Sequence, residues 1–237
     1  MKDKSLVVAK INLRNIKLAY IITGIVIACI IAQDIVLFIL DKLDIFKNGP
    51  DNSNIGIGNY LFLIAILGPI FISSMNFRKM MNLGGKRADF FNGSAMTYII
   101  MAAAISLAGL ILYYTYDRLL IQVYYGGGTL NVMHVFRWMD NGPIVAFLRQ
   151  FSFLYLFATF IHTLVAAQDK WYGWVADIVL VAIISVFPPI APLRAALVWF
   201  FNMILFHPVA VVQVASCLIL AVLIHMLNKP ILARKVI

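Results

Sequence analysis

Residues 76–94 read NFRKMMNLGGKRADFFNGS and separate two long apolar runs, residues 57–75 and 95–116. Each run has roughly the 20 residues that an α-helix needs to cross a bilayer. Between them stand the cations Arg78, Lys79, Lys86 and Arg87 and a single acid, Asp89. Cations this close to two spans place the segment on the cytoplasmic side of a membrane. The stretch therefore predicts both a membrane fold and its orientation.

The composition is that of a membrane protein. Hydrophobic residues make up 63% of the 237 positions, mean hydropathy is +0.93, and only 12% of residues are charged. A soluble domain cannot bury so much apolar surface. The net charge of +9 does not indicate a nucleic-acid partner, because the cations stand beside the apolar runs. Cys29 and Cys217 both lie inside apolar runs, which argues against a disulfide framework or a zinc site.

Six membrane spans are predicted in one all-α domain that covers residues 1–237. Five are clear apolar runs, and the sixth, at 171–187, is shorter and ends at Pro188 and Pro189. Residues 193–206 are too short to span and are bracketed by prolines, which predicts a broken, re-entrant outer helix. The predicted segments are an interfacial helix at 1–17, spans at 18–40, 57–75, 95–116, 144–167, 171–187 and 209–228, a cytoplasmic loop at 76–94 and the outer helix at 193–206.

The basic residues predict which way the chain is oriented. With both termini in the cytoplasm, thirteen of the 19 Lys and Arg residues fall on the inner side and six on the outer side. The outer six are Lys42, Lys47, Arg118, Arg137, Arg149 and Arg194. This imbalance follows the positive-inside rule, so we expect a multi-pass membrane protein with both ends in the cytoplasm.

The N-terminal residues 5–17 carry a helical pattern. Lys10, Arg14 and Lys17 recur at helical spacing, and a second face is apolar. The apolar positions are Leu6, Ala9, Leu13 and Ile16. A helix with one cationic and one apolar face is typical of the membrane interface, where it contacts lipids. The alternative is a basic flank that only sets topology.

Motifs for chemistry are missing. The chain has no G-x-x-x-x-G-K-[ST] phosphate loop, no H-E-x-x-H, no G-x-S-x-G and no glutamate at all. Its four histidines are scattered over different predicted spans, so hydrogen-bonding roles are favoured over metal binding. We therefore expect no catalytic residue, no metal and no cofactor in this chain.

Three charged residues inside or beside predicted spans leave alternatives open. Asp34 lies in the outer half of the first span, where it either serves a translocation path or gate or makes a helix-packing hydrogen bond. Asp177 is best explained as an interfacial charge near the start of its helix. Arg149 can pair with an acid or with a lipid phosphate.

The basic loop has features beyond its charge. Residues 77–83 can form about two helical turns in which Phe77, Met80 and Met81 stand beside Arg78 and Lys79. Gly84 or Gly85 can supply a left-handed C-cap. Asp89 can cap the next helix, which begins with Phe90. Methionine and aromatic side chains suit a protein groove and the cations suit an acidic rim, so the loop is predicted to dock a protein partner. The alternative is again a loop that only sets topology.

The stretch from Arg78 to Phe91 resembles the R-x-x-x-x-L-G-x-x-R-x-x-F-F loops of small bacterial export permeases. With the six spans, the interfacial helix and the outer broken helix, the chain is similar to permease subunits of type V, ABC-two-like, ATP-binding-cassette exporters. The resemblance implies that residues 77–92 form the coupling helix that docks onto a cytoplasmic ATPase. It also implies that residues 193–206, including Arg194 and Trp199, form an external gate.

The resemblance further implies the partners and the cargo. ATP and Mg²⁺ would bind a separate ATPase chain, and a second permease chain would complete twelve spans, as a homodimer rather than a heterodimer. Exporters of amphipathic peptides, such as phenol-soluble modulins, and lantibiotic immunity permeases are the most similar kinds, all in bacterial cell membranes. Two other functions remain open: a six-span substrate-capture subunit of an energy-coupling-factor importer, and an ion-coupled secondary transporter.

Overall fold

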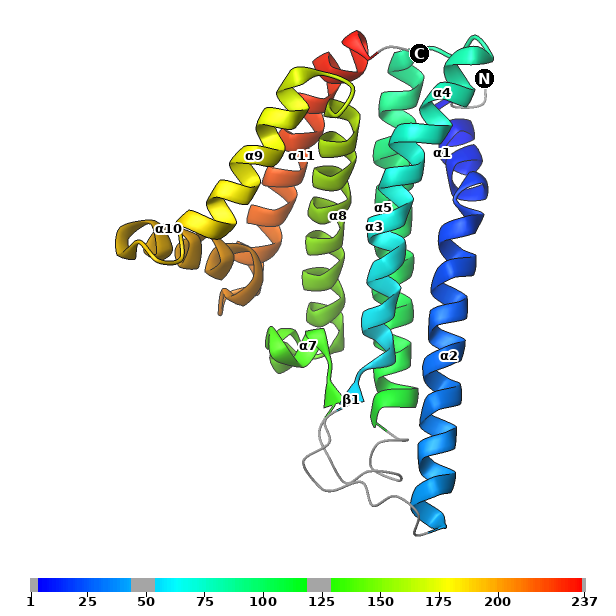
Figure 1. Cartoon of the computed structure of the whole chain (residues 1–237), viewed down its shortest axis with the longest axis vertical. Helices are drawn as coiled ribbons and strands as arrows, with labels where there is room; N and C mark the ends of the chain where they lie inside the picture. The colour runs from blue at the N-terminus through cyan, green and yellow to red at the C-terminus, as the bar shows by residue number, and fades with distance from the viewer. Residues whose placement is uncertain (1–3, 44–53, 119–128, 236–237) are drawn as a thin grey trace.

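A computed structural model describes residues 4–43, 54–118 and 129–235 of the chain. Lys47 lies outside these residues. The described part is a bundle of helices. The N- and C-termini of the chain lie at the same end of this bundle, which we call the terminal end (Figure 1). Five helices are long and apolar enough to cross a membrane, or six if one bent pair counts as a span. The predicted helical architecture is therefore confirmed, with five or six helices that could span a membrane where six spans were predicted.

The helices follow one another in this order: α1 Lys4–Asn15, α2 Lys17–Lys42, η1 Ile57–Leu61, α3 Phe62–Phe71, η2 Ile72–Asn76, α4 Phe77–Asn82, α5 Arg87–Leu112, η3 Tyr113–Asp117, α7 Val132–Val135, η4 Trp138–Asn141, α8 Pro143–Ala167, α9 Trp171–Val186, α10 Ala191–Phe201, η5 Asn202–Phe206 and α11 Ala210–Arg234. The short strands β1 Asn54–Ile55 and β2 Thr129–Leu130 pair in parallel at the end opposite the termini. η2, η3 and η5 are π-helical turns.

Helix α8 forms the centre of the bundle. It contacts α11 on one side and α3 and α5 on the other (Figure 1). Small residues on its buried face, such as Ala146, Ser152 and Ala158, let the neighbouring backbones approach closely. On the facing side of α11, Cys217 and Ala221 are fully buried. Close helix packing of this kind holds bundles together in lipid, where the hydrophobic effect between helices is absent.

Helices α9 and α10 stand apart from the bundle. The α9–α10 pair bends by 110° at the residues between them, where Pro188 and Pro189 interrupt the helical hydrogen bonds. Gly173 is the only buried residue of α9, and α10 has none. Most of their apolar side chains are therefore exposed on the outside of the bundle.

Helix α1 packs against α5 at the terminal end. Its buried face is formed by Val8, Ala9 and Asn12, whereas Leu6 of the predicted apolar face is exposed. Gly93 of α5 permits the contact, because a Cβ atom there would lie 2.5 Å from Cβ of Val8. Only Ile16 separates α1 from α2, and contacts with α5 and η2 hold the amphipathic segment against the bundle.

Replacing Gly93 by Ala should destabilise the chain by about 1–3 kcal/mol, because the added methyl group overlaps the branched side chain of Val8. Gly24→Ala is the matched control, since a Cβ at Gly24 meets nothing within 4 Å. Thermal or SDS unfolding in detergent measures both, and adding Val8→Ala to the Gly93 variant should recover part of the loss. Equal stability of the two glycine variants would contradict this account of the α1–α5 contact.

Candidate functional site

The predicted docking segment contains a short helix that ends in a defined cap. Helix α4 covers Phe77–Asn82, and Gly84 adopts a left-handed φ of +77°. The amide of Gly85 donates to the carbonyl of Met80 (3.0 Å), and that of Gly84 to Met81 (2.9 Å). These two bonds form a Schellman motif, which satisfies the last carbonyls of the helix. The predicted left-handed glycine cap is therefore present, at Gly84.

The apolar residues of this segment point inward. Phe77 and Phe90 are fully buried and Met81 is 9% exposed, whereas the sequence interpretation placed Phe77 and Met81 on a docking surface. The rings of Phe77 and Phe90 pack edge to face, with their centroids 5.2 Å apart. These side chains hold α4 and the start of α5 together, because an i, i+4 apolar pair on a helix can serve the core of its own chain as well as a partner.

The exposed surface of the segment is small and basic. Arg78, Lys79 and Lys86 are exposed, and Leu83 is 89% exposed at the turn. Met80 is half-buried. We call Arg78, Lys79, Leu83 and Lys86 the basic knob. It lies at the terminal end of the bundle, beside the N- and C-terminal helices (Figure 1).

Asp89 does not cap α5. The helix begins at Arg87, with Lys86 in the N-cap position and no side-chain cap. Asp89 lies in the first turn, where its negative charge interacts favourably with the positive end of the helix dipole. The stretch without helix is thus only 83–86, because α5 begins well before the predicted span at 95–116.

Arg87 binds the C-terminal end of α11. Its guanidinium donates to the carbonyls of Leu232 (2.9 Å), Ala233 and Lys235 (3.0 Å). The last carbonyls of a helix lack partners within the helix and carry partial negative charge, so a cation is favoured there. Arg87 is therefore a capping residue for α11, whereas Lys86 beside it is exposed.

Lys235 ties the same end to three further elements. Its ammonium group donates to the carbonyl of Ser73 in η2 (3.0 Å) and lies 3.4 Å from Oδ2 of Asp169. It also lies 5.5 Å from the centre of the Phe77 ring. Burial lowers the pKa of Lys235 below the usual lysine value, although Asp169 opposes that shift. We call Arg87 and Lys235 with these partners the C-terminal clasp.

The interfacial helix is also linked to this region. Asn76 donates to Oδ1 of Asn12 (3.4 Å), and Asn12 donates to Oγ1 of Thr97 (3.3 Å), all three being buried. Lys10, Arg14 and Lys17 are exposed. The polar chain therefore joins α1, η2 and α5, while the cationic face of α1 is turned away from them.

The charged residues proposed for a gate are dispersed. Tyr116 donates to Oδ2 of Asp34 (2.6 Å), so Asp34 makes an interhelical hydrogen bond between α2 and η3. Arg194 and Trp199 are both exposed on α10, and the guanidinium of Arg194 reaches the carbonyl of Pro188 at 3.5 Å. The hydrogen bond of Asp34 thus joins α2 to η3, whereas that of Arg194 stays within the α9–α10 bend.

The two remaining charges have protein partners. Arg149 is buried and donates to the carbonyl of Pro208 (2.9 Å), which settles its partner as backbone. Gln168 donates to both carboxylate oxygens of Asp177 (3.0 and 2.9 Å). Both residues stabilise connections between helices: Arg149 the segment before α11, and Asp177 the turn between α8 and α9.

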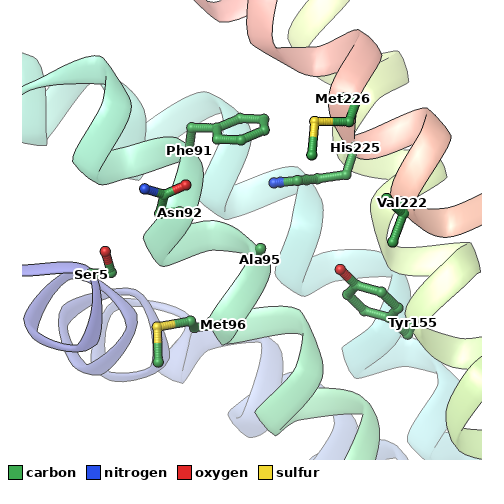
Figure 2. Close-up of a pocket in the computed structure, with 9 residues that line it drawn as sticks. All are labelled: Ser5, Phe91, Asn92, Ala95, Met96, Tyr155, Val222, His225 and Met226. Atoms are coloured by element: carbon green, nitrogen blue, oxygen red, sulfur yellow. The ribbon is translucent and has the colours of Figure 1, made fainter. Parts of the chain in front are cut away.

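A hollow of about 340 Å³ opens between α1, α5, α8 and α11 near the terminal end (Figure 2). We call it the lateral hollow, and its lining residues are Ser5, Phe91, Asn92, Ala95, Met96, Tyr155, Val222, His225 and Met226. His225 is 5% exposed. Neither of its ring nitrogens makes a hydrogen bond of normal geometry, although the backbone of Phe91 lies near enough to act on the ring. Its ring stacks on Phe91 with the centroids 4.2 Å apart.

The sequence interpretation missed this polar region because its histidines lie far apart along the chain. His162 of α8 is fully buried, interacts electrostatically with His225, and meets the hydroxyl of Tyr98 at 2.5 Å through Nδ1. Asn228 stands one turn from His225 on α11, and its buried amide has no hydrogen-bond partner. The signal available in the sequence was the i, i+3 pair of polar residues inside an otherwise apolar run.

No group of three metal-ligating side chains gathers anywhere in the described ranges 4–43, 54–118 and 129–235. No family model, curated protein or solved structure matches the chain. The function must therefore be argued from the basic knob, the C-terminal clasp and the lateral hollow.

Replacing Arg87 by Gln should loosen the end of α11, because three carbonyls lose a charged donor. The expected cost is about 1–2 kcal/mol. Hydrogen exchange followed by mass spectrometry should show faster exchange in the peptide that contains residues 228–235. Lys86→Gln, which removes an exposed charge next door, is the control and should leave that exchange unchanged. Equal protection in both variants would contradict the cap.

The buried Lys235 predicts a pH dependence of stability. The unfolded chain binds the lysine proton more tightly than the folded chain, since the folded pKa lies below 10.5. Between these two pKa values the free energy of unfolding therefore rises with pH. Relative to Lys235→Met, wild-type protein should gain stability as the pH rises toward 10.5. Melting curves at several pH values test this, and a stability difference that stays constant or shrinks with pH would refute it.

Proposed function

We propose that this chain is the membrane-spanning subunit of an ATP-driven ABC exporter and that a separate cytoplasmic ATPase docks on the basic knob. The observation that carries the proposal is the knob itself. The exposed Arg78 and Lys79 lie on a six-residue helix, and the exposed Leu83 and Lys86 lie in the turn that follows it. Phe77 and Met81 anchor the opposite face of this helix in the core. A loop that only set topology would need the cations but not this anchoring.

The way the knob is anchored supports a coupling role. Helix α4 continues from α3 through η2 and is joined to α5 by the turn 83–86. The C-terminal clasp then connects α5 and η2 to the end of α11 and to Asp169, next to the start of α9. A displacement of the knob would therefore reach several spans at once, because packed and hydrogen-bonded elements move as units.

Charge supports the class of partner. Arg78, Lys79 and Lys86 are exposed, whereas Arg87 is engaged with α11. Clustered exposed cations favour a partner with an acidic rim, and the exposed Leu83 offers an apolar anchor at the centre. In this proposal ATP and Mg²⁺ bind the ATPase, and the present chain holds neither.

The remaining parts of the proposal concern orientation, assembly and cargo. We place both termini in the cytoplasm, following the excess of cations at the terminal end. The exposed apolar faces of α9 and α10 are suited to packing against a second copy of the chain. The resulting dimer would have twelve spans, with α9 and α10 at or near its interface. Export of an amphipathic peptide or similar hydrophobic cargo in a bacterial cell membrane follows from the resemblance of residues 78–91.

Charge reversal of the knob tests the docking. The tagged chain is purified in mild detergent from its own cells, and ATP hydrolysis of the preparation is measured. The double variant Lys79→Asp/Lys86→Asp should lose about tenfold or more of the copurifying ATPase activity, because attraction becomes repulsion. Both residues are exposed and neither belongs to the C-terminal clasp, so folding should be unaffected.

The matched control is Lys42→Asp/Arg118→Asp, which reverses two exposed cations at the opposite end of the bundle. It should retain the ATPase. Absence of any ATPase from wild-type preparations, or equal amounts with both double variants, would overturn the proposal. A tightly bound small molecule in place of an ATPase would favour a substrate-capture subunit instead.

A further inference from the structure

We propose that the lateral hollow binds a phospholipid of the terminal-side leaflet, with its phosphate accepting a hydrogen bond from His225 and one acyl chain lying along Val222 and Met226. The proposal is independent of whether an ATPase drives the chain. The lateral hollow has a volume of about 340 Å³, which is at the lower end for ligand pockets. It can therefore hold only part of a lipid molecule.

His225 is the group that points to a ligand. A neutral imidazole offers one donor and one acceptor. The backbone of Phe91 can serve only one of the two, and neither nitrogen has a hydrogen bond of normal geometry, so this ring, 5% exposed, is left under-satisfied at a cost in free energy. Stacking on Phe91 fixes the ring, so that it cannot turn away to find a partner elsewhere. Figure 2 shows the ring directed across the hollow toward α5, with the hydroxyl of Tyr155 pointing into the same space.

The walls of the hollow indicate how a ligand enters. Val222 and Met226 are about half exposed, on the outer surface of an apolar span. The opening therefore faces sideways, toward the acyl chains of a bilayer. Phe91, Ala95 and Met96 complete an apolar lining that suits a hydrocarbon chain. A soluble polar metabolite would find few partners here besides His225, Tyr155, Asn92 and Ser5.

The depth and charge of the hollow select a phosphate. His225 precedes Lys229, the first cation after the apolar run of α11, by four residues or about 6 Å of helix, which places it just below the head-group region of that leaflet. Lys229 is exposed one turn nearer the terminal end, at i+4 from His225 and i+3 from Met226. Basic positions between transmembrane helices on this side bind anionic head groups, so phosphatidylglycerol is preferred over a zwitterionic lipid.

Native mass spectrometry of the delipidated full chain in detergent tests the site with three probes: dioleoyl phosphatidylglycerol, dioleoyl phosphatidylcholine and glycerol 3-phosphate. Wild-type protein should bind phosphatidylglycerol most tightly and glycerol 3-phosphate not at all. His225→Leu should weaken phosphatidylglycerol binding about tenfold, as expected for one lost hydrogen bond to a charged group. His225→Gln, which keeps a donor, should recover part of it.

Steric filling provides an independent variant. Ala95→Phe places a ring in the hollow and should abolish binding, whereas Ala32→Phe, on the exposed side of α2, should not. The melting temperature without lipid separates binding from folding. His225→Leu should be at least as stable as wild type without lipid, since it removes an unpaired polar group, and should lose the stabilisation that lipid gives.

Several outcomes would overturn the proposal. These are equal binding of phosphatidylglycerol by wild type, His225→Leu and Ala95→Phe; equal binding of phosphatidylcholine and phosphatidylglycerol; and binding of glycerol 3-phosphate as tight as that of the lipid. A lipid-free His225→Leu protein clearly less stable than wild type would also count against it, because His225 would then have a partner within the chain.

Discussion

Backbone polar groups inside a bilayer must find partners within the protein, and this constraint organises the whole chain. The spans contain π-helical turns and prolines that free carbonyl groups from the helical pattern. Side-chain donors from other elements bind four of the carbonyl groups at or beside these breaks. Lys235 donates to Ser73, Gln213 and Trp138 donate to Ile204 and Leu205, and Arg149 donates to Pro208. Each of these four carbonyl groups thereby links two elements of the bundle.

The same constraint explains which features the sequence could predict. The length of the apolar runs and the positions of the prolines predicted α8 and the break between α9 and α10, because run length and proline position are local properties of the chain. The roles of cations were not predictable in this way. Lys86 and Arg87 are neighbours of the same charge, yet one is exposed and the other caps α11, a helix that begins more than a hundred residues later in the sequence.

The apolar face of α4 shows a second limit of sequence reasoning. Phe77 and Met81 share a helical face beside exposed cations, a pattern that fits either a partner's groove or the chain's own core. The structure places them in the core, where Phe77 meets Phe90 and the ammonium group of Lys235. What distinguishes the two cases is the position of α11, which hydropathy does not encode. The basic knob is consequently smaller than predicted, but it is held more rigidly.

Buried polar groups with and without partners occur in both halves of the described bundle. At the β1–β2 end, Asp117 accepts from the amide of Ile57 (3.1 Å) and from Asn131 (2.6 Å), which holds the connections there in place. Some buried side-chain atoms have no hydrogen-bond partner; they belong to Arg149, Gln150 and Gln213 in that half and to His162, His225 and Asn228 near the terminal end. Unpaired buried groups raise the energy of a single fixed arrangement and favour one in which they acquire partners. At the terminal end such groups lie in the same half as the basic knob and the C-terminal clasp, so a ligand or a docked partner there can gain by changing the packing of α5, α8 and α11.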